Sequence, residues 1–411
     1  MRILAANKFY FHKGGDTTIF FATIDLLKSH GHDVSVFAMD NPKNLDSDYK
    51  KYFVSNVDLN EGGGLKGQVK SAARILYSFE ARKKISGLID AHKPEVAHLH
   101  NIYHQVSPSI IDALKAKGVP VVMTLHDYKL TCPAYSLMNK GGLCEACTGG
   151  RYYNVFKNKC TKGSAVKSLV NMAEMYLHHK IMKVYGKVDV FISPSRFLLE
   201  KTKEMGFKGE VVLLPNLVDI SEYEPMYQFK DRTIAYLGRL SAEKGTMTLL
   251  DGVKGLDIRL RLIGDGPMRE ALEKKCAAEG ISNVEFLGFR RGQELQDDLK
   301  SAMFTVITSE CYENNPRSVI ESFALGKPVV GARIGGIPEL VRDGVTGFTF
   351  NPGDSKDLME KIKKFASNPK LIENYGKNAR KIAEKEYNPE THYTGLMKIY
   401  ESAIRKSRQR N

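Results

Sequence analysis

Residues 309–331 constrain the fold of this chain more than any other stretch. The apolar run that ends at Ile307 is typical of a buried parallel strand, and a polar loop follows it. Pro316 suits the first turn of a helix, and Gly326 is a typical helix stop before the next apolar run. The order strand, loop, helix and strand predicts an α/β fold in which helices cover a parallel sheet.

Two carboxylates belong to this stretch: Glu313 in the loop and Glu321 in the second turn of the expected helix. The free N–H groups at a helix N-terminus attract phosphate, whereas carboxylates repel phosphate and accept hydrogen bonds from hydroxyl groups. A nucleotide sugar satisfies both conditions, because it has an anionic middle and hydroxyls at both ends. A helix-end charge plus a solvated surface glutamate explains the same spacing, so the pattern alone leaves both interpretations open.

The spacing Glu313-x7-Glu321 resembles the E-x7-E signature of the retaining family 4 glycosyltransferases, and the run 312–331 is similar to that family throughout. The resemblance implies the GT-B fold, with two Rossmann-like doubly wound domains facing a central cleft. It also implies transfer of a sugar from a UDP- or GDP-linked donor to an acceptor hydroxyl, with retained anomeric configuration, in cell-surface polysaccharide or glycolipid synthesis. The donor-binding residues that it implies in this run are Asn315, Pro316, Arg317, Ser318 and Glu321.

The chain of 411 residues, 42% of them hydrophobic, is too long for one typical core, so two domains are expected. The predicted domains are an acceptor-side domain at 1–217 and a nucleotide-sugar-binding domain at 218–388. The resemblance implies that a last helix, 389–411, crosses back to the first domain. There is no run of 18 apolar residues, and the N-terminal stretch meets charge too early for a signal peptide, so a cytoplasmic protein is expected.

Strands and helices alternate in the first domain, which predicts a doubly wound parallel sheet. Gly14 and Gly15 open the first helix, where glycines either let the backbone approach a phosphate or simply form a turn. The resemblance places this loop near the donor diphosphate or the acceptor, although Asp16 departs from the family pattern. His126 ends a buried strand, where ligands bind in open α/β sheets, but a single histidine is often structural. The resemblance implies that His126 contacts the donor sugar.

The second domain begins with a strand followed by Gly238, Arg239 and Lys244. Two cations around a glycine turn either clamp a diphosphate or are ordinary surface charges. The run is similar to the family's diphosphate-binding motif, which implies that Arg239 and Lys244 stabilise the departing diphosphate. Glu313 would then hold sugar hydroxyls and Glu321 the ribose. Asn216 matches a donor-binding position at the exit from domain one, where Leu217 replaces the family's glycine. No Asp-x-Asp metal motif ends a strand, so no catalytic metal cofactor is expected.

Four of the six cysteines lie in a predicted insertion at 130–162 and have the spacing C-x11-C-x2-C-x12-C; they are Cys132, Cys144, Cys147 and Cys160. Four thiolates suit tetrahedral zinc, and a closed set of four ligands indicates a structural site. Reduced cysteines that pack a loop, an iron–sulfur cluster and disulfides remain as alternatives.

The net charge of +14 is concentrated in residues 1–220, which hold 30 Lys and Arg against 20 Asp and Glu. An anionic partner or a solvated basic surface accounts for this excess. The segment 164–185 has the pattern of a basic amphipathic helix. It either lies on anionic lipid, which would place the protein peripherally on the inner face of the cell membrane, or packs its apolar face on the domain and leaves its lysines in water.

Two rival functions remain open. A non-enzymatic nucleic-acid-binding protein would use the cysteines and the basic stretch, but it leaves Glu313 and Glu321 unexplained, and no nucleic acid is expected as a partner. A sugar-nucleotide epimerase of the same fold would share the donor site but would need no acceptor.

Overall fold

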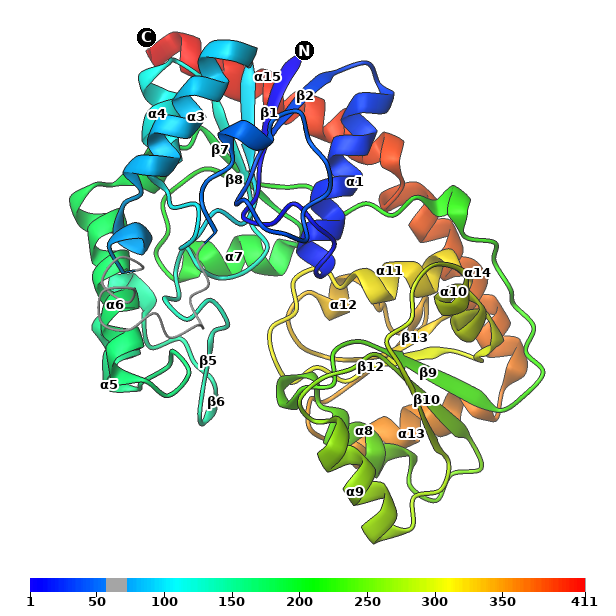
Figure 1. Cartoon of the computed structure of the whole chain (residues 1–411). Coiled ribbons are helices and arrows are strands. Elements are labelled where there is room, and N and C mark those ends of the chain that lie inside the picture. The colour runs from blue at the N-terminus through cyan, green and yellow to red at the C-terminus, as the bar shows by residue number, and fades with distance from the viewer. Residues whose placement is uncertain (57–71, 411) are drawn as a thin grey trace. The chain divides into compact units, whose positions relative to one another are not determined.

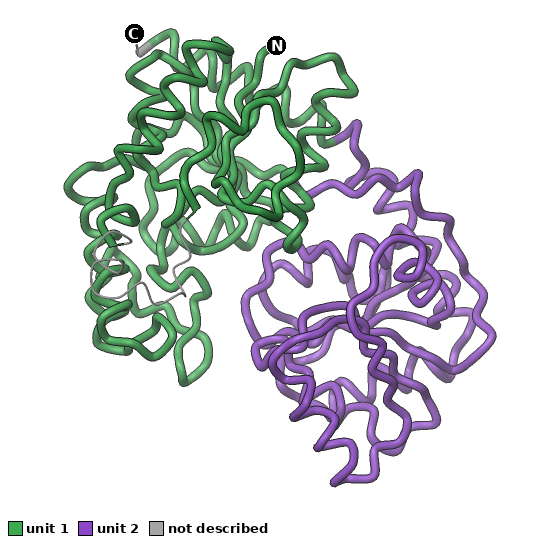
Figure 2. Tube along the Cα trace, viewed as in Figure 1, with its two compact units in different colours: residues 1–214, 392–411 green, residues 215–391 purple. Residues whose placement is uncertain are grey.

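The computed structural model describes residues 1–56 and 72–410. The chain divides into two compact units, shown in Figure 2. Unit 1 contains Met1–Leu214 and His392–Asn411, and unit 2 contains Pro215–Thr391. Figure 1 labels the elements of both units. Among the described residues, each helix is too short or too polar to span a bilayer.

Unit 1 is built on a six-stranded parallel sheet of order β2-β1-β3-β4-β7-β8. The strands are β1 (Arg2–Ala6), β2 (Asp33–Phe37), β3 (Val96–Leu99), β4 (Val121–Thr124), β7 (Val190–Ser193) and β8 (Val211–Leu213), with a small hairpin of β5 (Met138–Asn139) and β6 (Gly142–Leu143). The helices are α1 (Gly15–Ser29), α3 (Phe79–His92), α4 (Ser109–Ala116), α5 (Tyr153–Lys157), α6 (Ala165–Tyr176) and α7 (Arg196–Glu204). Short turns are η1 (Lys50–Tyr52), η2 (Thr148–Gly150), η3 (Leu177–Ile181, a π-helical turn) and η4 (Val184–Lys187).

Unit 2 is built on a second six-stranded parallel sheet, of order β11-β10-β9-β12-β13-β14. The strands are β9 (Thr233–Leu237), β10 (Arg259–Ile263), β11 (Val284–Gly288), β12 (Thr305–Ile307), β13 (Val329–Ala332) and β14 (Gly347–Phe350). The helices are α8 (Thr246–Val253), α9 (Arg269–Glu279), α10 (Gly292–Ser301), α11 (Arg317–Ala324), α12 (Ile337–Leu340), α13 (Ser355–Ala366) and α14 (Pro369–Glu386), with turns η5 (Ile220–Glu222) and η6 (Ala242–Lys244). The predicted fold class, two doubly wound parallel sheets, is confirmed.

Helix α15 (Pro389–Arg410) starts in unit 2 and belongs to unit 1 from His392 onward. Its apolar side chains, including Leu396, Tyr400 and Ala403, are buried in the core of unit 1 with residues of β1, β2 and α1. The Tyr400 hydroxyl lies 2.8 Å from His98 Nδ1 on β3, so a polar contact within this core fixes the position of the helix.

The strand order identifies where each sheet can bind a ligand. In unit 2 the order reverses between β9 and β12, and in unit 1 it reverses between β1 and β3. At such a switch point the loops that follow the two strands diverge to opposite faces and leave a crevice at the carboxyl ends of the strands. A ligand is therefore expected at the loops after β9 and β12 or at those after β1 and β3.

Candidate functional site

The predicted order of strand, loop, helix and strand around residues 309–331 is confirmed by β12, α11 and β13. Pro316 directly precedes α11 instead of lying within its first turn, and Ser318 is the second residue of the helix. Gly326 follows α11 with a φ of +71°, and a Cβ atom there would lie 2.7 Å from the ring of Tyr227. Both conditions favour glycine, since L side chains rarely adopt this φ.

The loops after β9 and β12 are in close contact. Gly245 has a φ of +63°, and a Cβ atom on it would lie 2.0 Å from the carbonyl oxygen of Thr308. The Thr308 hydroxyl donates a hydrogen bond of 2.9 Å to the carbonyl oxygen of Lys244. Any side chain at position 245 would push the two loops apart, so this glycine holds η6 against the loop that carries Glu313.

Lys244 and Glu313 form an ion pair across the two loops. Lys244 Nζ lies 2.5 Å from Glu313 Oε1, and the Ser309 hydroxyl donates to the same oxygen at 2.6 Å. Burial lowers the pKa of Lys244, but Glu313 and the nearby Cys311 raise it by more, so the net pKa lies above the usual 10.5. Lys244 therefore stays cationic at neutral pH although it is partly buried.

Glu321 belongs to a second ion pair, with Arg317 one helical turn earlier. Arg317 Nε donates to Glu321 Oε1 at 2.7 Å, and the Tyr223 hydroxyl donates to the same oxygen at 3.3 Å. Glu321 is buried, with 8% of its surface exposed. Arg317 thus supplies the counter-charge that a buried carboxylate needs.

Gly238 and Arg239 follow β9 directly. The Tyr236 hydroxyl donates to the carbonyl oxygen of Arg239 at 3.0 Å, which fixes the backbone of this turn. The Arg239 side chain is exposed, and within residues 1–56 and 72–410 no acidic side chain forms an ion pair with it. Arg239 is thus a cation at the switch point that is available for an anion.

Asn216 and Asn315 connect the start of unit 2 to the loop before α11. The backbone N–H of Asn216 donates to Asn315 Oδ1 at 3.1 Å, and Asn216 Nδ2 donates to the carbonyl oxygen of Asn315 at 3.2 Å. A third loop also contacts this region, because the N–H of Gly336 donates to the carbonyl oxygen of Glu313 at 2.7 Å. The structure therefore brings together the predicted residues of unit 2 around the loops after β9 and β12.

In unit 1, His126 follows β4 and is hydrogen-bonded to a second histidine that the sequence analysis missed. His126 Nε2 lies 2.9 Å from His100 Nδ1, and the two rings stack with centroids 5.1 Å apart. Burial lowers the pKa of His126 to about 4, and the Asp16 carboxylate only partly offsets this effect. His126 is therefore neutral at neutral pH. The signal for His100 was its place after β3, next to β4.

Gly14 and Gly15 lie at the start of α1, but neither needs to be glycine for backbone reasons. Neither has a positive φ, and a Cβ atom on Gly15 would meet no atom within 4 Å. Asp16, the next residue, accepts a hydrogen bond of 2.6 Å from Asn101 Nδ2 in the loop after β3. The switch point of unit 1 thus holds a carboxylate, Asp16, that the sequence analysis treated only as a departure from the family pattern.

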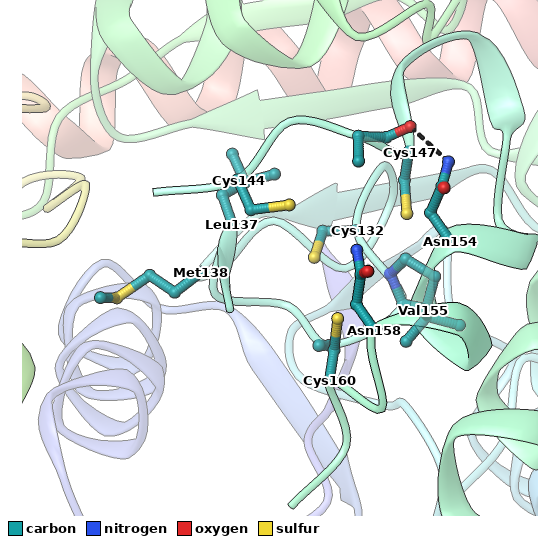
Figure 3. A pocket seen from close by; sticks show the side chains of 12 residues that line it. Cys132, Leu137, Met138, Cys144, Cys147, Asn154, Val155, Asn158 and Cys160 are labelled. Atoms are coloured by element: carbon teal, nitrogen blue, oxygen red, sulfur yellow. Dashed lines mark hydrogen bonds between the residues drawn. The ribbon is translucent and has the colours of Figure 1, made fainter. Parts of the chain in front are cut away.

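The four cysteines of the insertion line one small cavity of about 10 Å³ in unit 1, and their sulfur atoms surround it in Figure 3. All four are free thiols, so the disulfide alternative is not realised in this structure. Among the described residues, no three His, Cys, Asp or Glu side chains are grouped closely enough to hold a metal ion. The donor set fits zinc, but the spacing of the sulfur atoms does not.

Comparisons with known proteins cover both units. Residues 13–222 match the family model described as Glycosyltransferase Family 4, and residues 224–382 match that of Glycosyl transferases group 1. An uncharacterized glycosyltransferase of Methanocaldococcus jannaschii is 24% identical over 403 residues, which is 98% of this chain and 98% of that protein.

Two solved structures resemble the whole chain. HepE of Anabaena in complex with UDP and glucose has a TM-score of 0.68 at 19% identity, over 98% of this chain and 100% of that chain. Sucrose-phosphate synthase of Thermosynechococcus elongatus has a TM-score of 0.72 at 15% identity, over 98% and 99% of the two chains. These likenesses show that the two sheets belong to the GT-B fold.

Proposed function

Because the chain belongs to glycosyltransferase family 4, whose members use nucleotide-sugar donors and retain the anomeric configuration, we propose that it transfers a hexose from a UDP- or GDP-linked donor to an acceptor hydroxyl. The acceptor that we propose is a growing cell-surface polysaccharide or glycolipid. The observation that carries the proposal is the pairing of Lys244 with Glu313 beside the exposed Arg239 at the switch point of unit 2.

In the proposed reaction, the bond between the sugar and the β-phosphate breaks, and negative charge develops on the departing diphosphate. Arg239, Lys244 and the free N–H groups at the start of α11 would stabilise this charge. Glu313 contributes in two ways: it keeps Lys244 protonated, and it accepts hydrogen bonds from sugar hydroxyls. Arg239 and Lys244 would offset this charge without a metal ion.

His126 is proposed to contact the donor sugar, as the family resemblance implies. Since its pKa is about 4, its imidazole is uncharged at neutral pH and can hydrogen-bond a sugar hydroxyl. An uncharged contact suits a sugar ring that becomes cationic in the transition state, because a protonated imidazole would repel it. His100 fixes the orientation of this ring by the hydrogen bond of 2.9 Å. The acceptor proton is proposed to pass to an oxygen of the leaving phosphate.

An epimerase of the same fold is the nearest alternative. It would convert the donor without an acceptor, so incubation of the chain with each donor alone separates the two functions. A transferase releases at most slow hydrolysis products, whereas an epimerase forms a new nucleotide sugar.

Replacing Glu321 by glutamine is expected to weaken nucleotide binding by about tenfold or more, because a hydrogen bond to a charged group contributes about 1.5–3 kcal/mol. Glutamine keeps the shape of the side chain, and its amide oxygen can still accept the hydrogen bond from the Tyr223 hydroxyl. The measurement is calorimetric titration with UDP, GDP, UDP-glucose and GDP-mannose, after a thermal-shift screen has identified the donor base.

The matched control is Glu279→Gln, which also removes a carboxylate paired with a cation of unit 2, here Lys254, but on an exposed helix face. Glu279→Gln should bind the nucleotide as the unmodified chain does. Equal affinities of Glu321→Gln and the unmodified chain would remove Glu321 from the proposed donor site.

We also propose that the four cysteines of the insertion hold a structural zinc ion, which would require their sulfur atoms to move inward from their present spacing. The purified chain is then expected to contain about one zinc per molecule by elemental analysis, and Cys144→Ser with Cys147→Ser should remove it and lower Tm. The control is Cys276→Ser, at a cysteine remote from the insertion in sequence and located on α9. A chain without zinc, or one that keeps zinc in the double variant, would contradict this proposal.

A further inference from the structure

Helix α6 in unit 1 buries a mostly polar face, with Met175 as its apolar member, and exposes other apolar side chains. The inward side chains include Ser168, Asn171 and Glu174, all of which are at most 4% exposed. The outward side chains include Val166, which is 69% exposed, and Leu169, which is 46% exposed. A surface helix normally has the opposite arrangement, with its apolar stripe on the core. Met175 of the same helix is buried with Cys147 and Tyr152, so α6 packs on the domain through a mixed face and leaves Val166 and Leu169 in solvent.

Contacts of the inward face fix this orientation. Glu174 Oε2 lies 2.7 Å from Lys129 Nζ, and both side chains are almost fully buried. Asn171 Nδ2 donates to Thr161 Oγ1 at 3.0 Å. His178, in the π-helical turn that follows α6, lies 2.6 Å through Nε2 from the carbonyl oxygen of Leu76. Rotating α6 to bury its apolar side would leave the Lys129–Glu174 charges unpaired, which is costly.

Further apolar side chains are exposed in the segments that flank α6 in the sequence. Tyr153 and Phe156 on α5, which packs against α6 (Figure 1), are 51% and 43% exposed. Ile181, at the end of the π-helical turn, is 74% exposed. Exposed apolar side chains that occur singly need no explanation, but a set of five within residues 153–181 marks an interaction surface.

The same segment is strongly basic. Residues 151–183 contain seven Lys and Arg and one acidic residue, Glu174, which is buried. All seven basic residues are exposed; they are Arg151, Lys157, Lys159, Lys162, Lys167, Lys180 and Lys183. Residues 151–183 therefore present cations and apolar groups to the solvent, and no exposed anion.

We propose that this surface, formed by residues 151–183, binds the headgroup region of an anionic lipid bilayer. The lysines would lie among the anionic headgroups, while Val166, Leu169 and Ile181 would enter the boundary with the acyl chains. A second copy of this chain is disfavoured as the occupant because its net charge is also +14. A nucleic acid would satisfy the lysines but would leave the exposed aliphatic side chains in water. The proposal does not depend on the proposed sugar transfer.

The test is co-sedimentation of the full chain with vesicles of phosphatidylcholine alone and with vesicles that also contain 30% phosphatidylglycerol, about the anionic fraction that creates a substantial surface potential. Binding is expected only to the anionic vesicles, and it should weaken as the salt concentration rises. Lys157→Glu, Lys167→Glu and Lys180→Glu together should lower the partition coefficient by at least about 100-fold, since each lost cation contributes about fivefold and each new carboxylate adds repulsion.

A second variant separates the apolar contribution from the charge. Val166→Ser, Leu169→Ser and Ile181→Ser together should lower the partition coefficient at least about tenfold without changing the net charge. The matched charge control is Lys356→Glu, Lys363→Glu and Lys370→Glu, at three exposed lysines of unit 2, which should bind the anionic vesicles nearly as the unmodified chain does. The proposal would be overturned if the chain did not bind the vesicles, or if this control lost as much binding. It would also be overturned if the chain bound duplex DNA instead of vesicles and the serine variant kept that DNA binding.

Discussion

Replacing Lys244 by alanine is expected to lower kcat by about 100- to 1000-fold, the usual effect of removing one group that stabilises the charge of a transition state. Lys244 is kept cationic by Glu313, whose Oε1 lies 2.5 Å away, and it stands at the switch point where a diphosphate would leave. KM for the donor should change much less than kcat, because the charge on the departing diphosphate grows only as the bond breaks. The measurement is initial-rate kinetics with the donor identified by the titrations.

The control for this prediction is Lys254→Ala. Lys254 Nζ also lies within ion-pair distance of a glutamate, 3.0 Å from Glu279 Oε2, but the pair is exposed on the surface of unit 2. An exposed pair contributes about 0–1 kcal/mol to stability, so this variant should keep both Tm and kcat. If Lys244→Ala kept its kcat, or if Lys254→Ala lost as much, the assignment of Lys244 to the reaction would be refuted.

The position of the candidate site at the ends of β9 and β12 could be predicted from the sequence, because it depends on local signals. Apolar runs marked the strands, and Arg239 and Glu313 lie in the loops that follow two of them. The ends of parallel strands meet at one edge of a sheet, so residues that follow the strands were expected there. The Lys244–Glu313 ion pair could not be predicted, since Glu313 lies 69 residues after Lys244 and the distance between the two side chains depends on how the loops pack.

The orientation of α6 could not be predicted from the periodic spacing of its apolar residues. The spacing of apolar residues in 164–185 predicted a helix with two different faces, and α6 with its π-helical turn confirms that a helix is present. Periodicity does not tell which face is buried. Here the buried Lys129–Glu174 pair decides it, and its two members are 45 residues apart in the sequence. His100 was missed for a similar reason, because its role depends on a neighbour on another strand.

Replacing Glu174 by glutamine is expected to destabilise unit 1 by about 3–5 kcal/mol, because it leaves the buried Lys129 without a counter-charge. Glu174 Oε2 lies 2.7 Å from Lys129 Nζ and 3.2 Å from His104 Nε2. Burial raises the pKa of Glu174, but Lys129 and His104 lower it by more, so the folded pKa lies below the usual 4.5. The stability that this carboxylate contributes is therefore present above about pH 4.5 and is lost as the pH falls below it.

Two comparisons make the Glu174 prediction specific. In chemical denaturation, the difference between the unmodified chain and Glu174→Gln should be largest near pH 7 and should shrink as the pH falls below 4.5. Below this pH the carboxyl group is protonated in the unfolded chain and must give up its proton when the chain folds. The matched control is Asp90→Asn, because the pair of Asp90 and Lys117 has the same distance of 2.7 Å but is exposed. That variant should lose at most about 1 kcal/mol. Equal losses in the two variants would show that burial of the Lys129–Glu174 pair does not matter, and would remove the constraint that holds the apolar face of α6 outward.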